Sequence, residues 1–249
     1  MSDIQVLTEA EIASARHGGK ILRACLTMIA ALVEPGITTR FLDEKAEEFI
    51  TSHQGAVPAF KGYQNYPATI CASVNEECVH GIPSERVLAE GDIIALDCGV
   101  LFDGLYTDAC VSVGVGTIRP NAQHLLDVTQ HALDAALAII RKHTKVGDIS
   151  STIQTVVESA GFHPVRSLTG HGLGRTLHQF PDIPNLGTPE TGAELPVGAL
   201  IAIEPIVSAG SDEITEGGDG WTLSIRDGSL SAHVEHTVLV HAENCEIIA

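Results

Sequence analysis

The sequence predicts an α+β fold in which paired helices cover one side of an antiparallel sheet and the whole arrangement is repeated once along the chain. Two observations carry this prediction. Each half shows two helical patterns followed by strand patterns. Residues 88–97 and 195–204 also share a glycine turn, an apolar strand and a terminal acid, which is Asp97 in one and Glu204 in the other. At 249 residues and 44% hydrophobic composition, we expect a single catalytic domain with halves at about 1–118 and 119–249.

The first half begins with two predicted helices. Thr8 and Glu11 form a capping box before an apolar stripe that runs to Val33, and the Pro-Gly pair at 35–36 ends it. A second helix is expected at about 39–53, followed by a loop over 54–67 that is rich in Gly, Pro and Tyr. The strand patterns that follow fall at about 69–75, 92–99 and 106–114.

The second half repeats this order. Apolar faces indicate one helix around 125–139 and another around 153–160, and the strand patterns fall at about 168–172, 199–208, 221–226 and 232–240. Asp108 opens one alternating apolar strand and Glu235 opens another. Because these matches occur in the same order and no short period is present, we interpret them as one internal doubling rather than a solenoid.

Composition limits the partners and the compartment. The net charge is −18, from 32 acidic and 14 basic residues, which argues against a nucleic-acid partner. The longest apolar stretch, 21–33, is interrupted by Arg23 and is too short to span a bilayer, and the N-terminus lacks a signal-peptide pattern. Six cysteines without a Cys-x-x-Cys pair are typical of reduced thiols. We therefore expect a cytoplasmic protein that does not contact membranes.

Four acids and one histidine stand out as candidate metal ligands. Each acid ends or begins an apolar strand, and an ionised carboxylate is rarely buried unless it is paired or bound to metal. The set suits two divalent ions of Mn, Co, Fe or Zn, which could share an activated water in a hydrolase. The residues are Asp97, Asp108, His171, Glu204 and Glu235. For any single acid, an ordinary strand-end ion pair is an equally good interpretation, but for all four together it is a weak one.

The sequence also resembles a known family, the type I methionine aminopeptidases, which have the pita-bread fold. The resemblance extends from the first helix almost to the C-terminus. It rests on the five candidate ligands together with short motifs around them, which are Gly62-Tyr63, Tyr66-Pro67-Ala68-Thr69-Ile70-Cys71, Ser73-Val74-Asn75-Glu76, His80-Gly81-Ile82-Pro83, Gly170-His171-Gly172-Leu173-Gly174-Arg175, Ile203-Glu204-Pro205, Trp221-Thr222 and Glu235-His236-Thr237.

This resemblance implies hydrolytic removal of the initiator methionine from nascent polypeptides. Asp108 and Glu235 would bridge two metals, and Glu204 would also accept a proton from the attacking water. His80 would assist proton transfer, and His178 would stabilise the tetrahedral oxyanion. The methionine side chain would enter a pocket of Phe60, Tyr63, Tyr66, Cys71 and Trp221, bounded by His80, Leu177 and His178. The family further suggests a monomer and transient contact with the ribosome, although no basic patch in the sequence supports that contact.

Three positions depart from the family pattern. Leu177 stands where Phe is usual before His178, and Gln64-Asn65 replace a common His-Gly pair. His233 stands where Gln is common, two residues before Glu235. Because alternate residues of a strand share a face, we expect His233 to lie beside the metals and to alter metal preference or pH optimum.

Three other functions remain open at this stage. A proline-directed peptidase such as aminopeptidase P or prolidase, or a metal-dependent hydrolase of a small molecule such as creatine, would use the same fold but usually carries an additional domain. A non-catalytic pita-bread protein could bind peptides or partners, but loss of ligands would mark it, and all five are present here.

Overall fold

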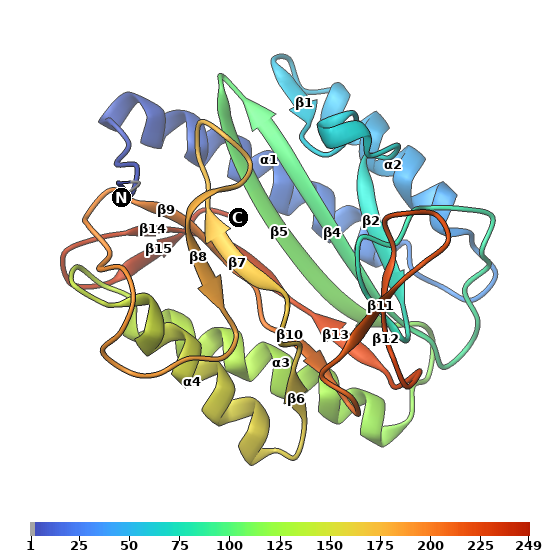
Figure 1. Ribbon diagram of the computed structural model, residues 1–249. Helices are drawn as coiled ribbons and strands as arrows, with labels where there is room; N and C mark the ends of the chain where they lie inside the picture. Colours follow the sequence, from blue (N-terminus) through green and yellow to red (C-terminus); the bar gives the residue numbers. More distant parts are fainter. Residues whose placement is uncertain (1–2) are drawn as a thin grey trace.

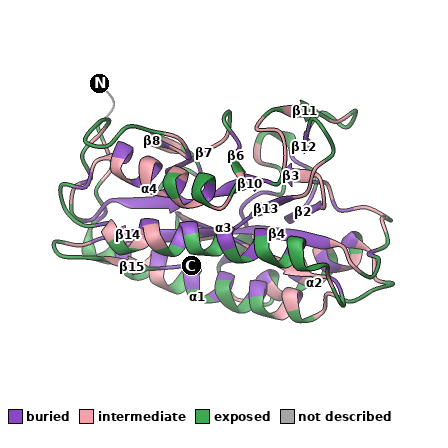
Figure 2. Ribbon diagram, turned by 90° about the horizontal axis from the view of Figure 1, so that it is seen from below, coloured by how far each residue is buried: buried purple, intermediate pink, exposed green. Residues whose placement is uncertain are grey.

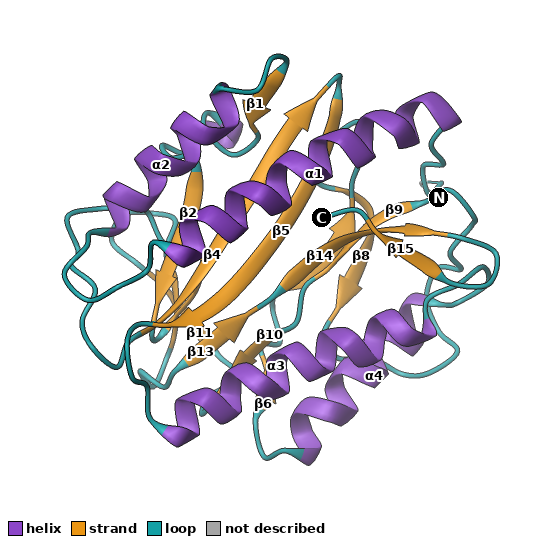
Figure 3. Cartoon of the chain, turned by 180° about the vertical axis from the view of Figure 1, so that it is seen from behind, coloured by secondary structure: helices purple, strands orange, loops and turns teal. Residues whose placement is uncertain are grey.

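A computed structural model describes residues 3–249 as one large antiparallel sheet with helices on one face (Figures 1 and 3). The nine-stranded sheet has the order β1-β4-β5-β14-β9-β7-β8, with β2 paired to β4 and β15 paired to β14. Its strands are β1 (Ala56–Pro58), β2 (Ile70–Val74), β4 (Ile93–Phe102), β5 (Leu105–Gly114), β7 (Thr169–Gly172), β8 (Gln179–Pro184), β9 (Leu200–Ile203), β14 (Glu235–Val240) and β15 (Cys245–Ile247).

Two helix pairs cover the sheet face seen from behind in Figure 3. They are α1 (Glu9–Ala31) with α2 (Thr39–Thr51), and α3 (Pro120–Ile139) with α4 (Val146–Ser159). The expected capping box is present, because Thr8 accepts from the amide of Glu11 and the Glu11 carboxylate accepts from the amide of Thr8. Each pair buries its apolar stripe in its own core cluster. Within residues 3–249, no helix has both the length and the apolarity needed to cross a bilayer.

Short strands make a second layer on the opposite side of the sheet from α1 and α2 (Figure 2). One three-stranded sheet has the order β13-β10-β6, and the other has the order β11-β12-β3. Their bounds are β3 (Glu77–Val79), β6 (His163–Pro164), β10 (Ile206–Ser208), β11 (Ile214–Glu216), β12 (Leu223–Ile225) and β13 (Ser231–His233). A single-turn helix, η1 (Tyr63–Asn65), lies in the loop between β1 and β2.

Equivalent backbone contacts in the two halves confirm the internal repeat. The residue that caps α2, Thr38, bridges Val87, and the residue that caps α4, Lys145, bridges Glu194. In each half a glycine amide then donates to a carbonyl at the end of a strand. Gly91 donates to Val115, which directly follows β5, and Gly198 donates to Val240, the last residue of β14. The predicted α+β class with helices on one side of an antiparallel sheet is therefore correct.

Two of the predicted strands are broken in the structure. The pattern 199–208 divides into β9 and β10, and 232–240 divides into β13 and β14, with the partners of each pair in different sheets. Pro205 has no amide hydrogen to continue the ladder, and the Pro205 carbonyl accepts from Val234 across the second break. The sequence does not predict strands β1, β3, β6, β8, β11 and β15, because most are very short and lie in segments without apolar alternation.

The packing of α1 on the C-terminal residues gives a test of the fold. A Cβ on Gly19 would lie 2.2 Å from the carbonyl oxygen of Ile248, which also accepts from Arg23 at 2.6 Å. Alanine favours a helix by about 1 kcal/mol over glycine. We nevertheless expect Gly19→Ala to lower the free energy of unfolding by about 1–3 kcal/mol, because the backbone must move apart.

Urea denaturation measures this difference. Gly218→Ala is the matched control, since its added Cβ meets no atom within 4 Å and should change stability little. Equal stabilities of the two variants would show that the contact between α1 and Ile248 is not tight.

Candidate metal centre and active site

Three of the candidate acids lie together on one face of the sheet, opposite the helices. Asp97 of β4 and Glu235 of β14 are both directly opposite Cys110 of β5. Opposed residues in an antiparallel pair share a face, and so do residues two apart on one strand. Asp108, two residues before Cys110, therefore joins Asp97 and Glu235 on that face.

The other half of the molecule supplies the imidazole and the fourth acid. His171 of β7 is opposite Ala202 of β9, and Glu204 follows two residues after Ala202, where Pro205 ends the strand. His171 Nε2 lies 3.7 Å from Glu204 Oε1. The two halves are joined beside Asp108, because Thr237 Oγ1 donates to the Asp108 carbonyl at 2.6 Å and accepts from its amide at 2.9 Å.

The donor set fits a metal centre. Ligand atoms of Asp108, His171 and Glu235 lie within 4.8 Å of one another, and all three residues are buried. One carboxylate oxygen of each of Asp97, Asp108 and Glu235 has no hydrogen-bond partner in the structure. Buried oxygens without a partner are costly, and a cation bound among them would remove that cost.

Burial also perturbs every titratable group of this cluster. It raises the pKa of Asp97 to about 7 and, together with the charges of neighbouring carboxylates, raises the pKa of Asp108, Glu204 and Glu235 well above the usual range. Burial lowers the pKa of His171 to about 3, so its imidazole is neutral and free to act as a ligand. Without a cation, the carboxyls therefore tend to hold protons.

Two further imidazoles border the cluster. The His178 ring lies 4.3 Å from that of His171, centroid to centroid, and its Nδ1 is 3.1 Å from the Tyr63 hydroxyl. The His80 ring meets Trp221 edge-on at 6.3 Å. Burial lowers the pKa of both His80 and His178, so both rings are neutral near pH 7 and can donate a hydrogen bond.

A cavity of about 170 Å³ adjoins the acids. Part of its wall is a buried apolar cluster that includes Phe60, Tyr66, Cys71 and Leu177. Tyr63 and Trp221 pack against this cluster. All thirteen residues that the sequence suggested as ligands, catalytic groups or pocket residues line this cavity. They are Phe60, Tyr63, Tyr66, Cys71, His80, Asp97, Asp108, His171, Leu177, His178, Glu204, Trp221 and Glu235.

Gln64, Val79 and His233 line the same cavity, and of these three only His233 was expected there from the sequence. Val79 lies on a short strand that carried no signal. Gln64 and Asn65 have φ of 48° and 72°, a left-handed backbone that favours glycine and that no local pattern revealed.

His233 lies where its spacing from Glu235 suggested. The strand breaks between the two residues, yet His233 Nε2 is 3.6 Å from Glu204 Oε2 and 4.0 Å from Glu235 Oε2. This nitrogen is buried and has no hydrogen-bond partner. The ring therefore faces the candidate metal centre as a further nitrogen donor.

Sequence comparison identifies the family. The profile of metallopeptidase family M24 matches residues 13–242. The chain belongs to this family. It is 43% identical to the methionine aminopeptidase of Clostridium perfringens over 96% of both chains, and 41% identical to methionine aminopeptidase 1 of Bacillus subtilis over 97% of both.

Solved structures of this family have the same fold. Methionine aminopeptidase from Rickettsia prowazekii matches with a TM-score of 0.96 at 37% identity over 99% of both chains. Prolidase from Pyrococcus furiosus matches with a TM-score of 0.80, but at 18% identity and over only 64% of its own length. The pita-bread arrangement expected from the sequence is confirmed, and at the sequence level the chain groups with the methionine aminopeptidases.

The raised carboxyl pKa values predict how metal binding depends on pH. Near pH 6 a cation must displace protons from the cluster, whereas His171 is already neutral and releases none. We expect the association constant for Mn²⁺ to rise about tenfold per pH unit below about pH 7, with at least one proton released per ion. Calorimetric titration in buffers of different ionisation enthalpy measures both quantities. A constant affinity between about pH 6 and 8 would contradict this account.

Replacement of His233 tests its effect on the metal centre. Cobalt prefers nitrogen donors more than manganese does, so His233→Gln should lower the affinity for Co²⁺ relative to Mn²⁺ by about tenfold and should shift the pH–rate curve. Competition titration of the two ions gives the ratio. The control is His131→Gln, which changes an exposed histidine of α3. If His233→Gln changes neither metal preference nor pH dependence, the ring does not act on the metals.

Proposed function

We propose that this chain removes the N-terminal methionine from polypeptides by metal-dependent hydrolysis. The observation that carries the proposal is the continuity of the apolar pocket with the cluster of four acids and His171 in one cavity. A side chain held in that pocket would present its own peptide bond to the acids. The similarity to methionine aminopeptidases over nearly the whole chain supports the same reaction.

The ligand set suits two divalent ions among Co, Mn, Fe and Zn. Asp108 and Glu235 lie on adjacent strands, with Asp97 on one side and His171 and Glu204 on the other, so these five residues together would hold the ions. Such ions lower the pKa of water so that hydroxide is available near neutral pH. The surrounding apolar residues limit the access of bulk water and strengthen every charge interaction in the site.

The remaining groups supply proton transfer and charge stabilisation. Glu204 lies between His171 and His233 with only 12% of its side chain exposed, and its raised pKa suits a carboxylate that takes a proton from the attacking water. His178, neutral and oriented by Tyr63, is suited to donate to the oxyanion that develops on the carbonyl oxygen. His80 borders the same space and is suited to pass a proton to the leaving amine.

The pocket chemistry supports methionine as the first residue. Its wall is aromatic and apolar, and the Cys71 sulfur adds a soft, polarisable contact that suits a thioether. Tyr66 is fixed by donating to the carbonyls of Ile70 and Gly81, so its ring forms a rigid wall. The carboxylate-rich floor favours the positive charge of a free α-amine, which explains cleavage at the N-terminus only.

We further propose that the substrates are nascent polypeptides in the cytoplasm. All six cysteines are unpaired, as is usual in a reducing compartment. A proline-directed reaction is less well supported, because the prolidase and Xaa-Pro peptidase structures that match are at most 20% identical and share the fold alone. A binding-only protein would have no need for an intact set of five ligands.

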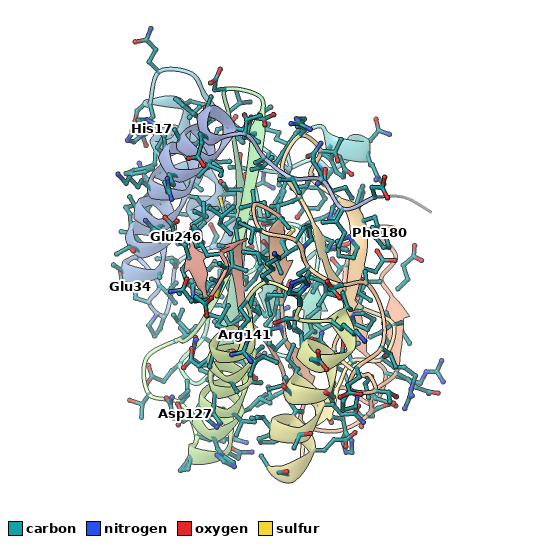
Figure 4. All side chains as sticks on the ribbon, turned by 90° about the vertical axis from the view of Figure 1, so that its left-hand side faces the viewer. His17, Glu34, Asp127, Arg141, Phe180 and Glu246 are labelled. Atoms are coloured by element: carbon teal, nitrogen blue, oxygen red, sulfur yellow. The ribbon has the colours of Figure 1, made fainter. Side chains whose placement is uncertain are left out.

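Peptide cleavage tests the reaction. After reconstitution with Mn²⁺ or Co²⁺, the protein should release free methionine from Met-Ala-Ser, should not cleave Xaa-Pro peptides and should be inhibited by chelator. Glu204→Ala should lower kcat by about 10²–10⁴-fold because the proton acceptor is lost. Glu34→Ala, which changes an exposed acid in the loop that follows α1, is the control and should retain full activity (Figure 4). Preferred release of the residue before proline would instead favour the proline peptidases.

A further inference from the structure

A second cavity, of about 470 Å³, continues from the reacting groups away from the methionine pocket. It shares five lining residues with that pocket, which are Val79, His80, His171, His178 and Glu204. Its outer wall comes from residues 167–169 and from strand β8. If methionine occupies the first cavity, as proposed above, the peptide that follows the scissile bond must leave through this groove.

Phe180 and Asp182 of β8 form the outer wall of the groove. They alternate with buried residues on the strand, so both lie on its exposed face, and both line the cavity. Phe180 is 42% exposed and belongs to none of the apolar clusters formed by residues 3–249. Figure 4 places Phe180 on the side of the molecule away from α1, whose His17 is labelled.

Strand register connects this wall to the metal centre. Asp182 is directly opposite His171, so its side chain points to the same face of the sheet, one strand spacing of about 4.8 Å further out. An extended peptide advances about 3.3–3.6 Å per residue. Phe180 lies two residues from Asp182 along β8, roughly 6.6 Å further on, so the wall that the two residues form is within reach of the third or fourth residue of a substrate.

The groove is suited to a cationic side chain. Its lining includes the exposed carboxylate of Asp182, which is not one of the candidate metal ligands, and contains no Lys or Arg among residues 3–249. An aromatic face beside a carboxylate binds a guanidinium through a cation–π contact and an ion pair.

Strand addition is a poorer alternative for holding the leaving peptide. β8 is the edge strand of the large sheet, but Pro181 and Pro184 lack amide hydrogens along it. Recognition must then depend on side chains. We propose that Phe180 and Asp182 form a subsite that selects substrates with arginine at the third or fourth position.

Matched peptides test this subsite with the full-length, metal-loaded protein. We expect kcat/KM for Met-Ala-Arg-Gly or Met-Ala-Gly-Arg to exceed that for Met-Ala-Gly-Gly by about three- to tenfold, and the advantage to shrink at high salt. Phe180→Ser should reduce the ratio to about one, and Asp182→Asn should remove its salt dependence. Val197→Ser, which alters a residue of the same 42% exposure outside the groove, should leave the ratio unchanged.

The ratio of kcat/KM for the arginine peptides to that for Met-Ala-Gly-Gly distinguishes failure of the subsite from failure of the proposed reaction. Failure to release methionine from Met-Ala-Gly-Gly would contradict the proposed reaction itself. Release of methionine without any arginine advantage, or with the same advantage in Phe180→Ser, would overturn the subsite and leave the reaction intact.

Discussion

The structure depends on holding four carboxylates together at a buried site, where water cannot solvate their charges. Asp97, Asp108, Glu204 and Glu235 are held at one face of the sheet, and burial raises the pKa of each. Such a cluster is costly without cations or protons. The fold must therefore be stable enough to hold the acids together, and the bound metals would return part of that cost as stability.

The doubled architecture explains how the acids are positioned. Each half contributes one helix pair and its own set of antiparallel strands, and the halves meet where β5 pairs with β14. Thr237 fixes that junction by bonding both backbone groups of Asp108. Because rigid strands carry most of the ligands and the helices occupy the other face, a small sliding of one half against the other would separate Asp108 from Glu235.

We attribute the proposed substrate selectivity to the shorter elements around this rigid centre. The β1–β2 loop supplies Phe60, Tyr63 and Tyr66 to the first cavity, and β8 supplies the wall of the second. The departures from the family pattern occupy the same layer. Leu177 fills the pocket wall as a buried apolar residue, and His233 brings an additional imidazole to the acids. The reactive centre can thus be maintained while its borders change.

Local sequence determined the helices, the long strands, the internal repeat and the identity of the acids, because periodicity and capping act over a few residues. Resemblance to a family suggested the pocket residues. The spacing of His233 from Glu235 already suggested that it lies beside the acids, but only the tertiary structure decided that the pattern 199–208 breaks after Ile203, that His233 also faces Glu204, and that Asp182 is opposite His171. These facts depend on strand register between segments distant in the chain, which no local pattern encodes.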